Sequence, residues 1–316
     1  MTRIFTEDQV RDAIGFDRHA LSWVEQGYIW LRERTLCMPP VFHIDIDDQS
    51  AVDVKGAYVA GLDAFAIKMA SGFYANHTMG LPSSSSVILL ISTKTGFCDA
   101  VFLDNGYLMN LRTALAGAVA ADYLARQDIA TVGIVGAGVQ ARAQLQALTL
   151  VRNFDCVMIW GRRGERAAAC AADIAKMTGA QVCVSDDLEA MVGQSDVVVT
   201  TTQTTEPLIK AEWIKPGTHI TAMGSDLPGK QELDLDVLVE ADLVVCDSIA
   251  QCEVGGELQH VDPAHLKRPP VALSDIICNA ATGRSTSDDI TICDMTGLGI
   301  LDTAISVAAS AKLSAD

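Results

Sequence analysis

The sequence predicts an α/β protein in which a doubly wound parallel sheet is joined to a second, strand-rich α+β domain. The parallel sheet is predicted by a glycine turn directly after the apolar run at 131–135, and by short apolar strands that alternate with helical segments from there on. Such alternation is typical of a sheet covered by helices on both faces. The first 110 residues instead mix apolar and polar positions in short runs bounded by Gly, Pro and Asp, which indicates the strand-rich domain.

The glycine turn has the layout of a dinucleotide site. Gly136 permits the tight turn, Gly138 lets the backbone approach a pyrophosphate, and Ala141 stands where a small residue allows helix and strand to pack closely. The phosphates would lie on the unpaired N–H groups of the helix that follows. A G-x-G-x-x-A pattern alone is not specific, because Gly-rich turns also join ordinary strands and helices. The β/α alternation behind it favours a Rossmann-type nucleotide domain.

Each element is expected from its local pattern of apolar residues. Strands are expected at 41–46, 65–69, 132–135, 156–160, 181–184, 196–200, 219–223 and 243–246, and helices at 112–126, 141–150, 163–177 and 297–313. We therefore place the strand-rich domain at 1–118, with 303–316 folding back on it, and the Rossmann-type domain at 119–302.

Composition excludes several classes of function. The net charge of −17 and the lack of a Lys/Arg-rich run argue against nucleic acid, which is held largely by phosphate neutralisation. The apolar runs are shorter than the roughly 20 residues that span a bilayer, and the first residues lack a signal-like apolar core. Nine cysteines without C-x-x-C pairs are expected to be reduced and mostly buried, so we expect a cytoplasmic protein.

Three side chains are candidates for chemistry. Lys68 sits in an apolar strand-like run, where an amine needs an anionic partner unless its head reaches solvent. Arg112 opens the predicted helix and suits a carboxylate or phosphate, or else is an ordinary surface arginine. Asp226 follows the strand at 219–223, where ligands of parallel sheets bind, although an Asx turn before Pro228-Gly229 is an equal interpretation.

Other residues give weaker indications. His43 is a candidate by residue type only, and isolated histidines are more often structural. No H-E-x-x-H or comparable metal motif is present, so no metal is expected. At the end of the second Rossmann strand, Arg162 and Arg163 stand where an acid would select NAD, which favours a 2′-phosphate and NADP unless these arginines contact nothing.

Several motifs together resemble the ornithine cyclodeaminase/μ-crystallin family over nearly the whole chain. They are Lys68, Asn110-Leu111-Arg112-Thr113-Ala114, and the segments 135–141, 224–234 and 290–299. Segments 52–58, 61–68 and 103–108 look most like the cyclodeaminase-like proteins of ectoine-utilisation clusters and the iminosuccinate reductase of the β-hydroxyaspartate cycle.

The resemblance implies roles for individual residues. Lys68 and Arg112 match residues that hold the substrate carboxylate, and Asp226 matches the acid/base residue of cyclodeaminases. Phe42 or His43 replaces a carboxylate-binding arginine that family members commonly carry, which argues against ornithine as the substrate. Lys55 or His43 could bind a second carboxylate instead, or Lys55 could be solvated. The expected cofactor-binding residues are Gly136, Gly138, Val139, Gln140, Arg162, Thr113, Thr201, Gly224, Met295 and Gly297.

The resemblance also implies an activity and an assembly. We expect NAD(P)H-dependent reduction of a small α-imino acid, with iminosuccinate to L-aspartate as the best candidate, and Lys68 and Asp226 as catalytic residues. An ornithine cyclodeaminase-type ammonia lyase, an alanine-dehydrogenase-like enzyme and a non-catalytic nucleotide-dependent binding protein are the alternatives. A homodimer formed through the strand-rich first domain is the expected state.

Overall fold

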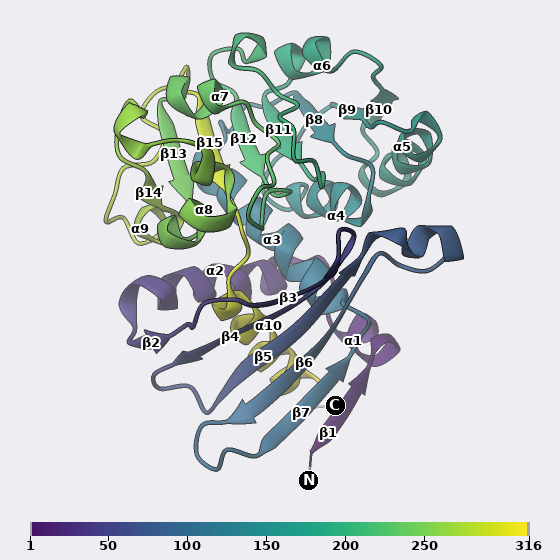
Figure 1. The fold of residues 1–316 in the computed structure, drawn as a ribbon, viewed down its shortest axis with the longest axis vertical. Coiled ribbons are helices and arrows are strands. Elements are labelled where there is room, and N and C mark those ends of the chain that lie inside the picture. The colour runs from purple at the N-terminus through teal and green to yellow at the C-terminus, as the bar shows by residue number, and fades with distance from the viewer. Residues whose placement is uncertain (1, 315–316) are drawn as a thin grey trace. The chain divides into compact units, whose positions relative to one another are not determined.

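The chain folds into two compact units, Met1–Arg112 with Leu298–Asp316 (unit 1) and Thr113–Gly297 (unit 2). The computed structural model describes residues 2–314, and Figure 1 shows its ribbon. From the sequence, we expected the boundaries between the two units at 118/119 and 302/303. In the structure these boundaries lie a few residues earlier, after Arg112 and before Leu298. No helix formed by the described residues is both long and apolar enough to cross a bilayer.

Unit 1 is a seven-stranded sheet with the order β1-β7-β6-β5-β4-β2, in which β3 also pairs with β4. Adjacent strands in this sheet run antiparallel, except that β1 and β7 run parallel to each other. The strands are β1 (Arg3–Thr6), β2 (Leu36–Cys37), β3 (Phe42–Asp47), β4 (Ser50–Val59), β5 (Ala64–Phe73), β6 (Ser84–Ser92) and β7 (Cys98–Leu103); the helices are α1 (Glu7–Ala13), α2 (Arg18–Glu33), η1 (Tyr74–Met79) and α10 (Gly299–Lys312).

Helix α10 packs against β4, β5 and α2. It approaches β4 so closely that a Cβ on Gly299 would lie 2.7–2.8 Å from three backbone atoms of Gly56. The hydroxyl of Thr303 then bridges β4 and β5, donating to the carbonyl of Ala57 at 2.8 Å and accepting from the amide of Ala66 at 3.0 Å. These contacts fix the residues of the first turns of α10 relative to the sheet.

Unit 2 is an eight-stranded, all-parallel sheet with the order β10-β9-β8-β11-β12-β15-β13-β14. The strands are β8 (Thr131–Val135), β9 (Cys156–Trp160), β10 (Gln181–Val184), β11 (Val197–Thr200), β12 (His219–Ala222), β13 (Leu243–Cys246), β14 (Val271–Ala272) and β15 (Thr291–Asp294). The helices are α4 (Val139–Leu148), α5 (Gly164–Thr178), α6 (Leu188–Gln194), α7 (Leu235–Glu240), α8 (Ile249–Gly255), α9 (Leu273–Ile277), η2 (Ala211–Trp213), η3 (Glu257–His260) and η4 (Pro263–His265).

The order of this sheet reverses at β8, from which the chain first builds outward to β10 and then returns to β11 on the other side. Helices pack on both faces, around two separate apolar clusters. This is the predicted doubly wound α/β fold, and the ligand site of such sheets lies beyond the carboxyl ends of the strands where the order reverses.

Two sequence expectations need correction. Helix α3 (Tyr107–Leu124) begins five residues before Arg112, so this arginine does not open the helix. All nine cysteines are free, as expected, but only Cys170, Cys246, Cys252 and Cys293 are buried, whereas Cys37 and Cys183 are exposed.

The close contact of Gly299 with Gly56 gives the first prediction. Gly299→Ala should destabilise the protein by about 1–3 kcal/mol, because a methyl group has no room against the backbone of β4. Urea denaturation measures this. Gly15→Ala is the control, since a Cβ there meets nothing within 4 Å; equal stability of the two variants would contradict the packing described here.

Candidate active site

Lys68 and Arg112 of unit 1 share one buried carboxylate, that of Asp302 on α10. The Nζ atom of Lys68 lies 2.8 Å from Oδ2 of Asp302, and Nε of Arg112 donates to Oδ1 at 2.9 Å. Lys68 is 1% exposed, Arg112 5% and Asp302 0%. The interpretations of Lys68 as a lysine that reaches solvent and of Arg112 as a surface arginine are therefore wrong.

Burial gives the two ends of the Lys68–Asp302 pair different proton affinities. Desolvation, with repulsion from Arg112, lowers the pKa of Lys68 to about 7 against the attraction of Asp302. Burial would raise the pKa of the Asp302 carboxyl, but the charges of Arg112 and Lys68 lower it below its ordinary value. Asp302 therefore stays ionised while Lys68 can exchange a proton near neutral pH, as a general acid or base requires.

Lys55 lies beside this group. The antiparallel register of β4 and β5 pairs Lys55 directly with Lys68, so the two side chains leave the same face of the sheet. The charge of Lys55 contributes to the lowered pKa values of both Lys68 and Asp302. Like charges at directly opposed positions destabilise a sheet. The charges of Arg112, Lys68 and Lys55 therefore all act on the carboxylate of Asp302.

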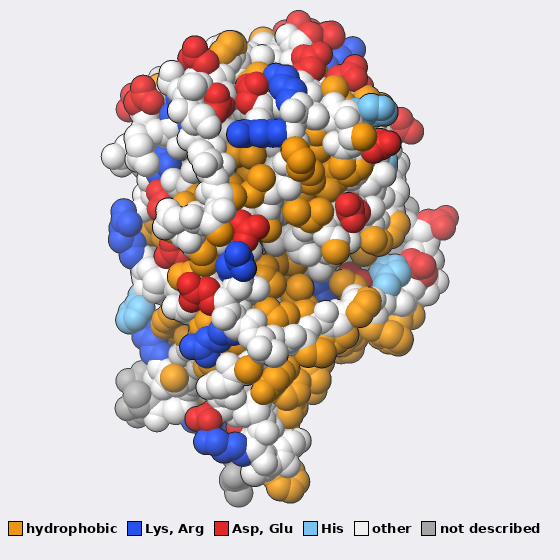
Figure 2. Space-filling model, turned by 90° about the vertical axis from the view of Figure 1, so that its left-hand side faces the viewer, with side chains coloured by type: hydrophobic (Ala, Val, Ile, Leu, Met, Phe, Trp, Pro, Cys, Tyr) orange, Lys and Arg blue, Asp and Glu red, His pale blue; other side chains and the backbone are white. Residues whose placement is uncertain are grey.

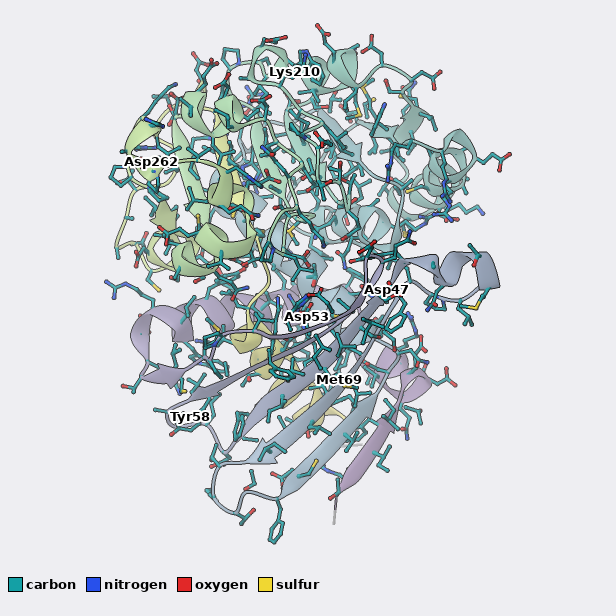
Figure 3. The ribbon with its side chains drawn as sticks, viewed as in Figure 1. Asp47, Asp53, Tyr58, Met69, Lys210 and Asp262 are labelled. Atoms are coloured by element: carbon teal, nitrogen blue, oxygen red, sulfur yellow. The ribbon has the colours of Figure 1, made fainter. Side chains whose placement is uncertain are left out.

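His43 is engaged by acidic neighbours. Its Nδ1 lies 2.6 Å from Oδ1 of Asp53 and its Nε2 2.8 Å from Oδ1 of Asp45. Hydrogen bonds to Asp53 and Asp45 raise the pKa of the imidazole. Figure 3 shows Asp53 on β4 and Asp47 at the end of the same hairpin. Two carboxylates thus surround the His43 imidazole.

The glycine turn of unit 2 has the geometry that a dinucleotide needs. Gly136 has a φ of 122°, and a Cβ there would lie 2.4 Å from Oγ1 of Thr201, so no other residue fits without a shift. Gly138 caps α4, and a Cβ there would meet nothing within 4 Å. Arg142 braces the turn by donating to the carbonyls of Ala137 and Gly138. The space above Gly138 is thus open to a ligand.

Most of the expected cofactor-binding residues follow strand ends. Gly136 and Gly138 follow β8, Arg162 follows β9, Thr201 follows β11, Gly224 follows β12, and Met295 and Gly297 follow β15. Since all these strands are parallel, the residues share one edge of the sheet. Val139 and Gln140 open α4, and the carbonyl of Thr113 accepts a hydrogen bond from Gln144 at 3.1 Å.

Asp226 lies in the loop after β12, at the same edge. Its Oδ1 is 2.6 Å from Nζ of Lys230, and its side chain is 41% exposed. The carboxylate is therefore accessible and has a cation beside it. Its acid/base role stays a prediction from the sequence.

Two buried carboxylates of unit 2, which the sequence analysis missed, hold this edge in place. Glu232 accepts from the amides of Thr202 at 2.5 Å and Gly224 at 2.8 Å. Asp247 accepts from the amides of Thr296 at 3.0 Å and Gly297 at 2.7 Å. The position of Asp247 directly after an apolar strand was a usable signal, because polar groups at strand ends often bind or brace ligands.

A family model settles the relationship of the chain to known proteins: the ornithine cyclodeaminase/mu-crystallin family matches residues 2–314. The chain belongs to this family. A provisionally named dehydrogenase of Rhizobium meliloti (strain 1021) is 44% identical over 321 residues, which cover 100% of this chain and 97% of the relative.

Two solved structures of the family are closely similar in fold. An archaeal alanine dehydrogenase dimer with bound NAD has a TM-score of 0.89 and 30% identity, covering 99% of this chain and 96% of that one. The iminosuccinate reductase of Paracoccus denitrificans in complex with NAD+ has a TM-score of 0.89 and 28% identity, covering 99% and 97%. The Rossmann-type fold predicted from the sequence is confirmed.

Unit 2 also contains a buried group of potential metal ligands that no sequence motif indicated. One ligand atom each of Cys246, Cys252 and Asp294 lies within 4.8 Å of the others. Burial raises the pKa of the Cys252 thiol well above its ordinary value, and this thiol donates to the carboxylate of Asp247 and the carbonyl of Asp294. Metal binding needs thiolates, so this group is better described as hydrogen-bonded thiols that pack the end of β13.

The lowered pKa of Lys68 predicts how stability depends on pH. Between about pH 7 and the ordinary lysine pKa of 10.5, the unfolded chain binds a proton at this lysine that the folded chain does not. Stability should therefore rise with pH across this window. Thermal denaturation from pH 6 to 10 measures it, and Lys68→Met should flatten the rise. An equal rise in that variant would show that Lys68 is not the group responsible.

Proposed function

We propose that this protein is an NAD(P)H-dependent reductase that converts a small α-imino acid into an L-amino acid. The observation that carries the proposal is the pairing of Lys68 and Arg112 with the single buried carboxylate of Asp302, with Lys55 directly opposite Lys68 in the sheet. Such a site suits a small molecule with one or more carboxylates. Family members of known structure with bound NAD include an alanine dehydrogenase and an iminosuccinate reductase, whose substrates or products are small amino and imino acids.

The residues of unit 2 fit a dinucleotide. The open space above Gly138 and the N-terminus of α4 suit a pyrophosphate, which backbone N–H groups and the helix dipole would bind. A reduced nicotinamide supplies the hydride for such a reaction. Gly224, Thr201 and Gly297, held by the buried carboxylates and strand ends described above, are the residues we expect around the cofactor.

The side chains then have three tasks. Arg112, with its forked donors, and Lys68 bind the α-carboxylate and orient the imine. The hydride forms a new C–H bond at the imine carbon, and a proton must form the new N–H bond. Lys68 and Asp226 are the two candidates to transfer that proton. The lowered pKa of Lys68 lets it exchange a proton near neutral pH, and Asp226 has an accessible carboxylate beside Lys230.

Among imino acids we favour iminosuccinate, with L-aspartate as the product. This dicarboxylate brings two negative charges, and Lys55 provides a cation beside Lys68 on the same face of the sheet. Arg162, exposed after β9, favours NADPH over NADH, although the two family structures described above contain NAD. Free cysteines at exposed positions support action in the reducing cytoplasm.

The activity is tested by loss of reduced-nicotinamide absorbance with imino acids formed in solution. Oxaloacetate with ammonia should give turnover at least tenfold faster than pyruvate with ammonia, because only the first imino acid engages Lys55. NADH and NADPH are each tested as donors. Release of ammonia from ornithine without net cofactor change would favour a cyclodeaminase instead.

Asp226→Asn serves as the companion variant in this assay. It should bind the reduced cofactor with unchanged affinity, measured by fluorescence titration, but should turn over more slowly. Lack of turnover by the wild-type protein on every imino acid, together with tight cofactor binding, would contradict the reductase and leave a nucleotide-dependent binding protein.

We further propose that unit 1 forms a homodimer through the face of its sheet opposite α10. Side chains of this face alternate with the buried ones, and many are exposed and apolar: Ile4, Phe42, Ile44, Tyr58, Met69, Leu89 and Leu103. Tyr58 and Met69 are labelled in Figure 3, and orange apolar side chains are visible on the lower half of Figure 2. An antiparallel sheet with one face packed on helices normally has a polar outer face, so an apolar one indicates a partner.

The dimer predicts a solution mass of twice the chain mass of 33.6 kDa by light scattering. The double substitution Met69→Glu with Tyr58→Glu should shift the protein to monomer, because it places charges in the apolar face. Val254→Glu is the control, since Val254 is 63% exposed but belongs to unit 2. A monomeric wild-type protein would exclude the dimer.

A further inference from the structure

We propose that Asp302 is a positioning residue for the reaction: its carboxylate holds Lys68 as the group that donates the proton to the imine nitrogen and fixes Arg112 to receive the substrate carboxylate. This inference rests on the proposed reductase activity. It assigns the proton transfer to Lys68 rather than to Asp226.

The geometry of Asp302 fits this role. The carboxylate uses one oxygen for each cation, Oδ2 for Lys68 and Oδ1 for Arg112. The two cations come from different elements, β5 and α3, whereas Asp302 stands in the first turns of α10. Helix α10 is itself fixed on the sheet through Gly299 and Thr303. Asp302 is therefore the part that sets the spacing between the lysine and the arginine.

The charges around Lys68 explain why the carboxylate is needed. The charged groups that act on its ammonium are Arg112 from α3, Lys55 from β4 and Asp302 from α10. Two of the three are cations, and burial also disfavours the charged lysine. Of these three groups, Asp302 is the one that stabilises the protonated form of Lys68. Without it, Lys68 would be a neutral amine at physiological pH and could not serve as an acid.

The proton transfer balances with the hydride transfer. A bound reduced nicotinamide would supply the hydride for the new C–H bond at the imine carbon and would itself be oxidised. At Lys68, an N–H bond of the ammonium breaks as a new N–H bond forms at the substrate nitrogen. Lys68 is left as a neutral amine and regains its proton from water. A lysine that titrates near neutral pH can both give and regain the proton at a useful rate.

The sign of the pH effect follows from this step. Reduction needs protonated Lys68, so kcat/KM should fall as pH rises through the pKa of this lysine in the free enzyme. Asp302→Asn keeps the size of the side chain but removes its charge, so it should move the midpoint of this fall to lower pH by at least one unit. At a pH above both midpoints, kcat/KM should then be at least tenfold lower than in the wild type.

The test compares pH profiles of kcat/KM for wild type, Asp302→Asn and Asp302→Glu. Asp302→Glu keeps the charge and should restore the midpoint to within about half a unit of the wild type. Thr303→Val is the matched control, because it removes the contacts of the Thr303 hydroxyl with Ala57 and Ala66 without touching Lys68. It should lower the melting temperature and leave the midpoint unchanged. A midpoint that moves in Asp226→Asn but not in Asp302→Asn would overturn the proposal.

A second measurement separates this inference from the reductase activity. The pH dependence of the melting temperature reports the protonation of Lys68 with no substrate present. In Asp302→Asn the rise of melting temperature with pH should begin at least one unit lower than in the wild type, and adding Lys68→Met should abolish it. If the rise of melting temperature is shifted in Asp302→Asn but the wild type shows no turnover, only the reductase activity is contradicted. If the wild type turns over but the rise is not shifted in Asp302→Asn, the role of Asp302 is contradicted.

Discussion

A buried carboxylate between two buried cations is the constraint on which unit 1 depends. Asp302, Lys68 and Arg112 are all nearly or fully inaccessible to solvent, and removing one partner of such a group costs about 3–5 kcal/mol because the remaining charges lose their compensation. A hydrophobic triad of similar size would be at least as stable. We therefore infer that these charges serve the small anionic substrate proposed above rather than stability.

The surrounding structure serves to keep that group in place. Gly299 lets α10 approach the backbone of β4 at Gly56, and the hydroxyl of Thr303 satisfies backbone groups of two strands. In unit 2 the same principle applies at the carboxyl edge of the parallel sheet. There Glu232 and Asp247, buried and bonded to backbone amides, fix the loops that carry Gly224 and Gly297. In both units, buried carboxylates order the segments that we expect to contact ligands.

Local pattern was sufficient to predict much of the fold. The runs at 156–160, 181–184 and 243–246 coincide with β9, β10 and β13, because strands of a parallel sheet are short, mainly apolar segments both in the buried interior, as in β13, and at the exposed edge, as in β10. Strands β6, β7, β14 and β15 were not among the predicted strands, and neither were β1 and β2, which lie at sheet edges and are largely exposed. Helix α3 was placed five residues late because its first turn, Tyr107 to Asn110, contains none of the alanines on which the prediction depended.

The site was only partly predictable from the sequence. Lys68 and Asp226 could be singled out from their positions in a strand and after a strand. Asp302 could not, because its partners are 234 and 190 residues away along the chain and only the fold brings them together. The available signal was Asp302 itself, a charged residue within the apolar run Ile300 to Ile305. An acid buried in a helix needs a cation as a partner, because an unpaired buried charge is costly. His43 illustrates the converse, since the sequence did not show that Asp53 and Asp45 surround it.

The most direct test of this account is the proton affinity of Lys68 in the intact protein. In protein labelled with 13C at the lysine ε-carbon, the resonance that disappears in Lys68→Met identifies this side chain, and its chemical shift can be followed against pH. We expect a titration midpoint near 7, as burial beside Arg112 requires. A midpoint near the ordinary lysine value of 10.5 would contradict it.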